Sequence, residues 1–393
     1  MAEPHRLSHG PWGLAETDAA TAPGVDGSWM DRAIDIAWLG AGRTHPNPLV
    51  GAVVVKGDTI VGEGYHEACG LEHAEVAALA RAGGDARGAT LYATLEPCAH
   101  FGRTPPCTER ILESGVSRVV VSTIDPDPRV NGAGIDALRQ GGIEVTAGPR
   151  AERAMLLNIP YFKRTLGLGA AVTIKAACSL DGRIATRRGS RDTISGGQAR
   201  QFVHRLRAVH EAVLVGSETL LVDRPRLDCR LIDGARVPTP VVMDARLRFP
   251  TDCPWIGQRR PFIVLTSRDH DGERRSRIAA GGGRVRAVEK KGGRLDPPSA
   301  LGGLAREGVT SVLVEGGAGV FSSFMEGNMW DALHVFVSPL LFGAKGVGLS
   351  PRAIDRARLG AVPVASAVFG ADVLVSYLSG KTRDVLMEKL VPR

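Results

Sequence analysis

Four residues of the kinds that hold and serve a metal ion most constrain how this chain can fold. His73 and Glu75 stand two positions apart. Cys98 and Cys107 follow, with Pro97 directly before the first cysteine. One imidazole and two thiolates leave a tetrahedral Zn²⁺ with one open position for water. Glu75 is then free to carry protons while that water attacks an amino-bearing ring carbon. The pattern predicts a fold that gathers these positions, with hydrolytic chemistry where they meet.

The same ligands could instead form a closed zinc site that only ties loops together. Such a site needs a fourth protein ligand, which His100 or Cys69 could supply. A purely structural site gives Glu75 no role, whereas a hydrolytic site does. The sequence therefore favours a catalytic zinc site.

Strand and helix patterns alternate after Ser28, which predicts an α/β layer with helices packed on a sheet. Residues 50–55 form an apolar run short enough to be a buried strand. The expected strands cover 50–55, 59–64, 90–95, 116–123 and 143–146, and the expected helices begin at Trp29 or cover 73–81, 108–113 and 135–140.

A second cycle of strands and helices starts at Ala170. We interpret it as a second domain, because a chain of 393 residues is too long for one ordinary domain. In this part, residues 312–314 form a strand that runs into Glu315-Gly-Gly317, a glycine turn of the kind that holds phosphate on backbone N–H groups. No complete G-x-G-x-x-G accompanies the first strand, which disfavours a standard Rossmann domain. We predict a disordered tail at 1–28, a first domain at 29–148, a linker at 149–168, a second domain at 169–380 and a tail at 381–393.

Composition limits where the protein acts and what it binds. The six cysteines are unevenly spaced, which indicates reduced thiols in a cytoplasmic enzyme and not a disulfide framework. No apolar run approaches the roughly 18–20 residues that span a bilayer. Lys and Arg are scattered and only 5% of the residues are aromatic, so we expect neither a nucleic-acid nor a membrane partner.

Several motifs together resemble one enzyme family. They are Thr44-His-Pro-Asn-Pro-Leu-Val-Gly51, Gly64-Tyr-His66, His73-Ala-Glu75, residues 95–107, Asp125-Pro126, residues 175–185, Gly216-Ser-Glu-Thr219, Asp223-Arg-Pro-Arg-Leu227 and Glu315-Gly-Gly317. From about residue 29 to about residue 378, the chain resembles the bifunctional riboflavin-biosynthesis deaminase–reductases. Eight residues separate Cys98 from Cys107, where the common deaminase pattern has two, and the longer insertion is typical of that family.

For the first half, the resemblance implies a cytidine-deaminase-like three-layer α/β/α domain. It would deaminate 2,5-diamino-6-(5-phosphoribosylamino)pyrimidin-4-one, a phosphorylated pyrimidine. Zn²⁺ on His73, Cys98 and Cys107 would lower the pKa of a bound water, with Glu75 as the catalytic proton carrier. The residues that would bind substrate are Asn47 and His66 at the pyrimidine edge, Arg103 at the phosphate, and Asp125. For His66, an ordinary Gly-Tyr-His turn stays an alternative.

For the second half, the resemblance implies a dihydrofolate-reductase-like α/β domain. It would pass a hydride from NADPH to C1 of the ribosyl group and convert that group to ribityl. Lys175 and Glu315 would position the substrate and handle protons. The other substrate-binding residues would be Arg191, Arg207, Leu227 and Arg230. The residues that match the cofactor cleft are Ala177, Thr193, Thr219, Asp223, Ser267, Gly317, Ala318, Gly319, Val320, Phe321, Ser322 and Ser323. Thr266-Ser-Arg268 ends an expected strand and would suit the 2′-phosphate.

The second half departs from the family at two places. Arg224 stands in a motif that is often Asp-Asp-Pro, and Thr193 ends a motif that is Ser-x-Trp in the family. The lost aromatic ring affects the wall beside the nicotinamide, whereas Arg191 and Arg224 add positive charge for phosphate. We nevertheless predict an active reductase, and a homo-oligomer that is a dimer or a tetramer. Two alternatives stay open: a cytidine- or adenosine-type deaminase with a degenerate second domain, and a zinc-stapled regulator that binds nucleotide or RNA.

Overall fold

The structure is a computed structural model that describes residues 25–101, 105–250, 253, 255–256, 260–267, 272–351 and 353–392. The chain divides into two compact units. Unit 1 combines the residues up to Leu168 with those from Lys381 onward, and unit 2 is Gly169–Gly380. The second domain predicted from the sequence has the same bounds as unit 2.

Unit 1 is built on a five-stranded sheet with the strand order β2-β1-β3-β4-β5. Strands β3, β4 and β5 are parallel to one another, and β1 runs antiparallel to both of its neighbours, β2 and β3. All residues of β1 but the last are buried, because helices cover both faces of the sheet. The strands are β1 (Gly51–Lys56), β2 (Thr59–Tyr65), β3 (Thr90–Ala93), β4 (Arg118–Val121) and β5 (Glu144–Ala147).

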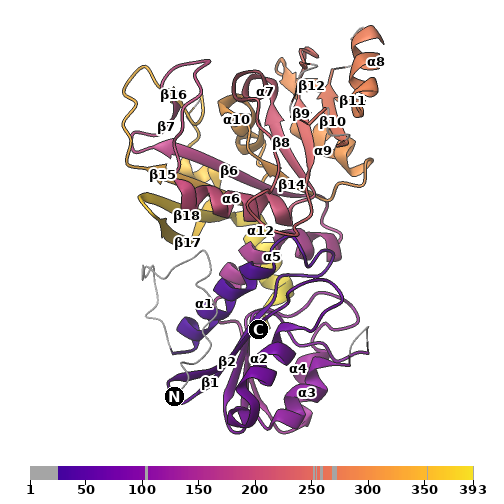
Figure 1. Cartoon of the computed structure of the whole chain (residues 1–393), viewed down its shortest axis with the longest axis vertical. Helices are drawn as coiled ribbons and strands as arrows, with labels where there is room; N and C mark the ends of the chain where they lie inside the picture. Colours follow the sequence, from indigo (N-terminus) through magenta and orange to yellow (C-terminus); the bar gives the residue numbers. More distant parts are fainter. Residues whose placement is uncertain are drawn as a thin grey trace. The chain divides into compact units, whose positions relative to one another are not determined.

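Helices on the two faces of this sheet make unit 1 a three-layer α/β/α domain (Figure 1). One face packs against α2 (Ala74–Ala82), α3 (Cys107–Ser114) and α4 (Ala133–Gln140). The other face packs against α1 (Val25–Ala37) and α5 (Ala151–Thr165). Short 3₁₀ turns follow α1 and α2, at Trp38–Gly40 and Gly83–Ala86. The predicted fold class is therefore confirmed for this unit.

Helix α5 replaces the predicted linker at 149–168. Its apolar side chains Met155, Leu157 and Phe162 are buried within unit 1. Asn158 lies at a kink of the helix and bonds both backbone groups of Leu49, accepting from its N–H and donating to its carbonyl oxygen at 2.8 Å each. The linker prediction was wrong because it was based on the glycines and prolines of this segment and did not take the apolar face of the helix into account.

Helix α12 (Gly380–Leu390) replaces the predicted tail at 381–393 and belongs to unit 1. Leu386 and Leu390 are fully buried. The backbone N–H of Ile124 donates to the carbonyl oxygen of Leu390 at 2.8 Å, and Arg383 forms an ion pair with Glu152 of α5. The last helix of the chain therefore completes the core of the first unit.

The predicted tail at 1–28 is partly helical, because α1 begins at Val25 and not at Trp29. The first turn of α1 is held by Asp26, whose carboxylate accepts from the Tyr92 hydroxyl at 2.8 Å and from Arg118 at 2.7 Å. Residues 1–24 lie outside the described part of the chain.

Unit 2 is built on a nine-stranded sheet with the order β11-β10-β9-β8-β14-β6-β15-β18-β17. The strands from β11 to β15 are parallel, and β18 and β17 are antiparallel. They are β6 (Ala171–Ser179), β8 (Ala212–Gly216), β9 (Thr239–Met243), β10 (Phe262–Thr266), β11 (Gly283–Ala287), β14 (Ser311–Val314), β15 (Ala332–Ser338), β17 (Ala361–Phe369) and β18 (Asp372–Ser379). Two short pairs lie outside this sheet: β7 (Arg183–Ala185) with β16 (Val347–Gly348), and β12 (Lys290–Lys291) with β13 (Arg294–Leu295).

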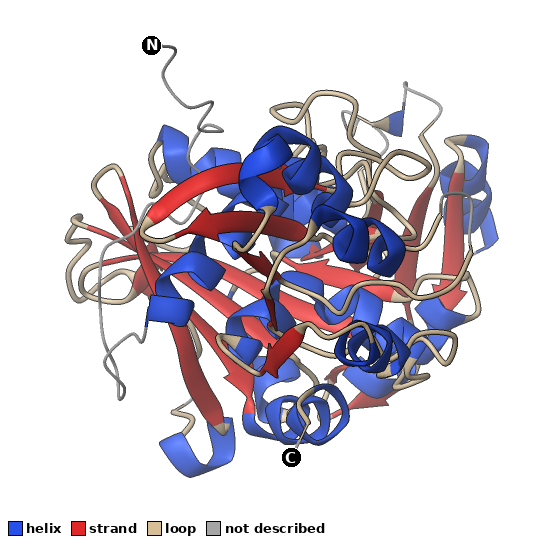
Figure 2. Cartoon of the chain, turned by 90° about the horizontal axis from the view of Figure 1, so that it is seen from below, coloured by secondary structure: helices blue, strands red, loops and turns tan. Residues whose placement is uncertain are grey.

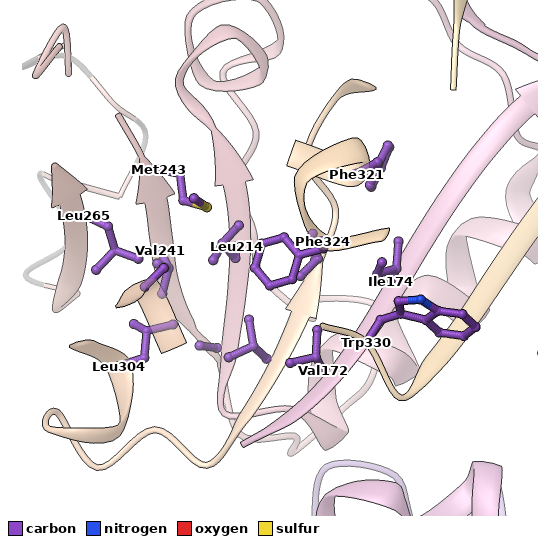
Figure 3. Close-up of a cluster of buried hydrophobic side chains, with 14 of the residues drawn as sticks. Val172, Ile174, Leu214, Val241, Met243, Leu265, Leu304, Phe321, Phe324 and Trp330 are labelled. Carbon is purple, nitrogen blue, oxygen red and sulfur yellow. The ribbon is translucent and has the colours of Figure 1, made fainter. Parts of the chain in front are cut away.

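Helices flank the strands of unit 2 as well (Figure 2). They are α6 (Gly197–Val209), α7 (Ser217–Asp223), α8 (Gly272–Ala280), α9 (Pro297–Ala305), α10 (Ala318–Glu326) and α11 (Arg356–Leu359). On one face, Phe324 of α10 and Leu304 of α9 pack against strand residues such as Leu214 (Figure 3). On the other face, Phe202 of α6 packs against Phe336 and Phe369. Among the described residues, no helix combines the length and apolar character needed to cross a bilayer.

Candidate active sites

The structure brings the three predicted zinc ligands together in unit 1. Nδ1 of His73 lies 3.2 Å from Sγ of Cys107 and 3.6 Å from Sγ of Cys98. In a tetrahedral site with the usual Zn–S and Zn–N lengths, ligand atoms lie roughly 3.5–3.8 Å apart. Among the described residues, these three are the whole group of His, Cys and acidic side chains near enough to share one ion. The donor set therefore fits Zn²⁺ with one position left open, and neither Cys69 nor His100 closes it.

Two helix starts place these ligands. His73 is the N-cap of α2, and Cys107 is the first residue of α3. Helix α2 lies so close to β2 that a Cβ on Gly64 would stand 2.4 Å from the carbonyl oxygen of Ala74. A glycine is required at this position for the start of α2 to reach the sheet. Hydrogen bonds of the Cys98 sulfur with Cys107 and with His73 lower the pKa of the Cys98 thiol to about 4. The lowered pKa favours the thiolate, which is the form that binds metal.

Glu75 lies in the first turn of α2 and is 3% exposed. Its Oε2 atom is buried and has no hydrogen-bond partner among the described residues. Burial raises the pKa of this carboxyl to about 7. A buried carboxyl group next to the ligand cluster, with one oxygen available, can accept and release a proton at this site.

Asn47 and His66 lie beside the ligand cluster. Nδ1 of His66 donates to the carbonyl oxygen of Glu72 at 3.0 Å, so Nε2 must accept, and it takes a hydrogen bond from Nδ2 of Asn47 at 3.1 Å. The rings of His66 and His73 are 5.4 Å apart. The Asn47 amide oxygen has no partner among the described residues. His66 thus fixes the orientation of the Asn47 amide. A residue that only formed a Gly-Tyr-His turn would not make this contact.

Asp125 differs from Asn47 and His66 because its carboxylate already accepts hydrogen bonds from other protein groups. Its Oδ1 accepts from the Asp127 N–H at 3.0 Å and from the Tyr161 hydroxyl at 2.7 Å. Burial raises the pKa of Asp125 to about 6. The described contacts make it a support for the loop after β4. Arg103 lies outside the described residues.

Glu96 is a supporting residue that the sequence analysis missed. Its carboxylate accepts from the backbone N–H groups of Asp125, Gly132, Gly134 and Ile135 at 2.9–3.2 Å. It therefore ties the start of α4 to the segment that carries Cys98. Its place directly before Pro97-Cys98 was the available signal.

Unit 2 contains a cavity of about 800 Å³ at the carboxyl ends of its parallel strands. Ligands of open α/β sheets bind in this position. The predicted residues that line it are Lys175, Ala177, Arg207, Thr219, Asp223, Leu227, Glu315, Gly317, Ala318, Gly319, Val320, Phe321 and Ser323. Most of the predicted reductase site is therefore gathered in one cavity.

A buried charged cluster forms part of the cavity lining. Arg207 donates to both carboxylate oxygens of Glu315, at 2.6 and 2.9 Å, and to the carbonyl oxygen of Asp228 at 3.0 Å. Burial acts to raise the pKa of Glu315, but Arg207 and Lys175 together hold it below its ordinary value. Burial lowers the pKa of Lys175. Arg207 is thus bound within the site and is not on a solvated helix face.

The cavity fits a dinucleotide where its glycine turn meets the start of α10. The Gly317 N–H donates to the Thr219 hydroxyl at 3.1 Å, and a Cβ on Gly316 would stand 2.8 Å from Cβ of Val320. A Cβ on Gly216, at the end of β8, would stand 2.9 Å from Cγ2 of Val320, so glycine is needed there for the end of β8 to approach α10. Backbone N–H groups at the start of a helix, bounded by glycines, are suited to phosphate groups.

Five predicted residues do not line the cavity. Arg230 forms an ion pair with Asp228 at 2.5 Å, and Arg191 and Thr193 are exposed. Ser267 is buried and donates to the carbonyl oxygen of Ala245 at 3.0 Å. Ser322 is buried and donates to the carbonyl oxygen of Ala318 at 2.7 Å. Three further residues that no sequence motif indicated, Asp244, Arg246 and Arg248, follow β9 and line the cavity.

Comparisons with known proteins match each half of the chain to a known domain family. Residues 24–123 match the cytidine and deoxycytidylate deaminase zinc-binding region, and residues 170–373 match the RibD C-terminal domain. The riboflavin biosynthesis protein RibD of Bacillus amyloliquefaciens is 43% identical over 318 residues, which is 80% of this chain and 85% of that protein. The chain belongs to the RibD family. RibD of Escherichia coli (strain K12) is 38% identical over 336 residues, 82% of this chain and 90% of that protein.

Solved RibD structures are similar over both units. RibD of Acinetobacter baumannii has a TM-score of 0.66 at 33% identity, covering 90% of this chain and 98% of that one. A diaminohydroxyphosphoribosylaminopyrimidine deaminase/5-amino-6-(5-phosphoribosylamino)uracil reductase from Thermotoga maritima has the same TM-score at 34% identity and the same coverage.

As a RibD protein, the chain is a bifunctional enzyme of riboflavin biosynthesis, with a zinc-dependent deaminase domain and an NADPH-using reductase domain. A deaminase with a degenerate second domain and a zinc-stapled regulator no longer account for the chain.

Proposed function

We propose that unit 1 deaminates the diaminohydroxyphosphoribosylaminopyrimidine, and that unit 2 reduces 5-amino-6-(5-phosphoribosylamino)uracil, the compounds for which the Thermotoga maritima protein is named. The buried Glu75 carboxyl beside a three-ligand metal cluster is the observation that carries the first assignment. The first product is then the substrate of the second unit.

In unit 1, His73, Cys98 and Cys107 would hold Zn²⁺, which when bound acts as a Lewis acid that activates water at neutral pH. Glu75 takes a proton from the attacking water and delivers it to the departing ammonia. Asn47, oriented by His66, hydrogen-bonds the pyrimidine edge through its amide oxygen. We also assign Arg103 to the substrate phosphate and keep Asp125 as a support of the site.

In unit 2, NADPH when bound supplies the hydride for C1 of the ribosyl group. Ring opening leaves negative charge on the ribosyl ring oxygen, and Lys175 donates a proton to that atom. Glu315 and Arg207 hold Lys175 and the substrate in place. Arg230 and Arg191, which lie outside the cavity lining, are assigned to the substrate phosphate, and Leu227, which lines the cavity, is assigned to the substrate. The other predicted lining residues are assigned to the cofactor.

Substitution of Glu75 tests the deaminase assignment. Glu75→Gln should keep its zinc and its NADPH oxidation but lose ammonia release by about 10²–10⁴-fold, because the proton carrier is gone. Glu72→Gln, an exposed acid just before the zinc ligand, is the matched control and should behave as wild type. Metal content, ammonia release from the diaminopyrimidine substrate, and NADPH oxidation with 5-amino-6-(5-phosphoribosylamino)uracil supplied directly are measured on the same samples. Equal ammonia release by Glu75→Gln and wild type would refute the assignment.

The cytoplasmic location and the dimeric or tetrameric state also belong to this proposal. Light scattering after size-exclusion chromatography tests the second, and a monomer at all concentrations would contradict it.

A further inference from the structure

Helix α5 holds the loop that carries Asn47, although it packs on the opposite face of the sheet from the helices that begin at the metal ligands. Asn158 of α5 is 4% exposed, and its side-chain amide bonds both backbone groups of Leu49, two residues after Asn47. Arg164, in the last turn of α5, donates to the carbonyl oxygen of Pro46, directly before Asn47. One helix therefore holds the chain on both sides of Asn47.

The sequence of the loop explains why it needs a partner outside itself. Pro46 and Pro48 flank Asn47 and have no N–H group, so the loop has few backbone donors. The Asn47 N–H donates within the loop, to the carbonyl oxygen three residues earlier, at 2.8 Å. The next N–H along the chain, that of Leu49, donates to Asn158 at 2.8 Å. The backbone of the loop thus closes a turn before Asn47 and depends on a remote side chain after it.

The backbone of α5 is irregular at the residue that makes these bonds. Asn158 has a φ of −124° and a ψ of 20°, and Pro160 follows two residues later. Proline lacks the N–H that would continue the helical hydrogen bonds, so a kink is expected here. An asparagine amide presents an acceptor and a donor side by side, which matches the N–H and the carbonyl oxygen of one residue. Asn158 therefore bonds Leu49 as a paired backbone would.

The connection from this anchor to the Asn47 side chain is short and stiff. Two residues span at most about 7 Å, and the residue between is Pro48, whose ring fixes φ near about −65°. On the other side, His66 accepts a hydrogen bond from the Asn47 amide at 3.1 Å, and its own N–H donates to the carbonyl oxygen of Val50 at 2.9 Å. A shift of Leu49 must therefore move the Asn47 amide relative to the metal cluster.

We propose that Asn158 is a positioning residue of the deaminase, which acts through Leu49 and Pro48 to hold the Asn47 amide oxygen at the pyrimidine edge. The proposal rests on the role assigned to Asn47 under the proposed function. Asn158 itself touches neither substrate nor metal. Arg164 supports the same loop from its other end and contributes less, because its contact lies at the surface.

A double-mutant cycle on the full chain tests the proposal, with ammonia release from the diaminohydroxyphosphoribosylaminopyrimidine as the assay. Asn158→Ala should raise KM about tenfold or more and change kcat less, because a contact made equally in the ground state and the transition state acts mainly on KM. Asn47→Ala should raise KM at least as much. The double variant should be no worse than Asn47→Ala alone, since Asn158 acts only through Asn47.

Met155→Ala is the matched control, because Met155 is a fully buried residue of the same helix. It should lower the thermal midpoint of unit 1 without changing KM. Exchange of the Leu49 N–H with solvent deuterium is a readout that does not depend on turnover, and it should become faster in Asn158→Ala but not in Met155→Ala. Asn158→Ser keeps one polar group for Leu49 and should raise KM less, so it completes the cycle if Asn158→Ala does not retain zinc.

Additive effects of Asn47→Ala and Asn158→Ala on kcat/KM would mean that Asn158 only stabilises unit 1, and would overturn the proposal. A rise in KM for Met155→Ala as large as that for Asn158→Ala would do the same. A wild-type KM in Asn158→Ala, together with a raised KM in Asn47→Ala, would overturn the proposal and leave the role of Asn47 intact. A wild-type KM in Asn47→Ala would remove that role from the proposed function, and the proposal with it.

Discussion

The two sites of this chain are assembled in opposite ways. In unit 1, the metal ligands and Glu75 come from the starts of α2 and α3 and one loop, within residues 73–107. In unit 2, the cavity is lined from the ends of β6, β8, β9 and β14, which are spread from Lys175 to Glu315. A compact site can be recognised in a short motif, whereas a distributed site appears only when the strand order is known.

Metal removal should produce the largest difference between the activities of the two units. Chelation should abolish ammonia release, because Cys98, Cys107 and His73 then hold no Lewis acid, and should leave NADPH oxidation by unit 2 largely unchanged. Both rates are measured before chelation, after it and after zinc is restored, with 5-amino-6-(5-phosphoribosylamino)uracil supplied directly for NADPH oxidation. A parallel loss of NADPH oxidation would contradict the separation of the two sites.

Removal of Arg207 should give the converse result. In Arg207→Ala, Glu315 is left as a buried charge without its partner, which costs about 3–5 kcal/mol of the free energy of unfolding and should abolish NADPH oxidation. Ammonia release should persist. Arg207→Lys should recover only part of the loss, because an ammonium group cannot reproduce two parallel hydrogen bonds. Arg200→Ala, an exposed residue of the same helix, is the control, and an equal effect there would point to a loss of helix stability instead.

Substitution in α12 tests whether the end of the chain belongs to unit 1. Leu386→Ala should lower the free energy of unfolding of unit 1 by about 2–5 kcal/mol, because the side chain is fully buried. Ammonia release should therefore be lost at a lower temperature, while NADPH oxidation keeps its thermal midpoint. Glu388→Ala, on the exposed side of the helix, should change neither midpoint. A shift in the NADPH midpoint alone would place α12 in unit 2.

A change of pH should have a smaller effect, on the free energy of unfolding of unit 2. Burial lowers the pKa of His210 to about 4 and that of His334 to about 3. The unfolded chain then takes up protons near pH 6.5 that the folded unit does not, so stability present above pH 6.5 is lost as pH falls toward 4. The slope is at most about 1.4 kcal/mol per pH unit for each histidine. Thermal unfolding of unit 2 between pH 7.5 and pH 5 should show this slope, and His210→Gln should reduce it. An identical slope in the variant would refute the assignment to His210.

Sequence patterns predicted the features that local chemistry determines. The zinc ligands and Glu75 belong to a small set of residue types at restricted spacing, and the alternating strands and helices gave the α/β class. The sequence-based predictions were wrong or incomplete where a residue contacts a partner that lies far from it in the sequence. Leu386 and Leu390 pack into a core whose other residues end at Leu168, and nothing near them indicates this. Arg248 looks like a surface arginine until the pairing of β8 with β9 brings it beside Ser217.

The return of α12 to unit 1 also affects how the protein is made. During translation, the residues that form most of unit 1 precede all of unit 2, while Leu386 and Leu390 follow it. At about 5–20 residues per second, synthesis of the intervening Gly169–Gly380 takes roughly 10–40 s. Throughout this interval, the surface around Ile124 and α5 lacks its covering helix. The deaminase unit of a nascent chain therefore reaches its final stability only after the reductase unit has left the ribosome.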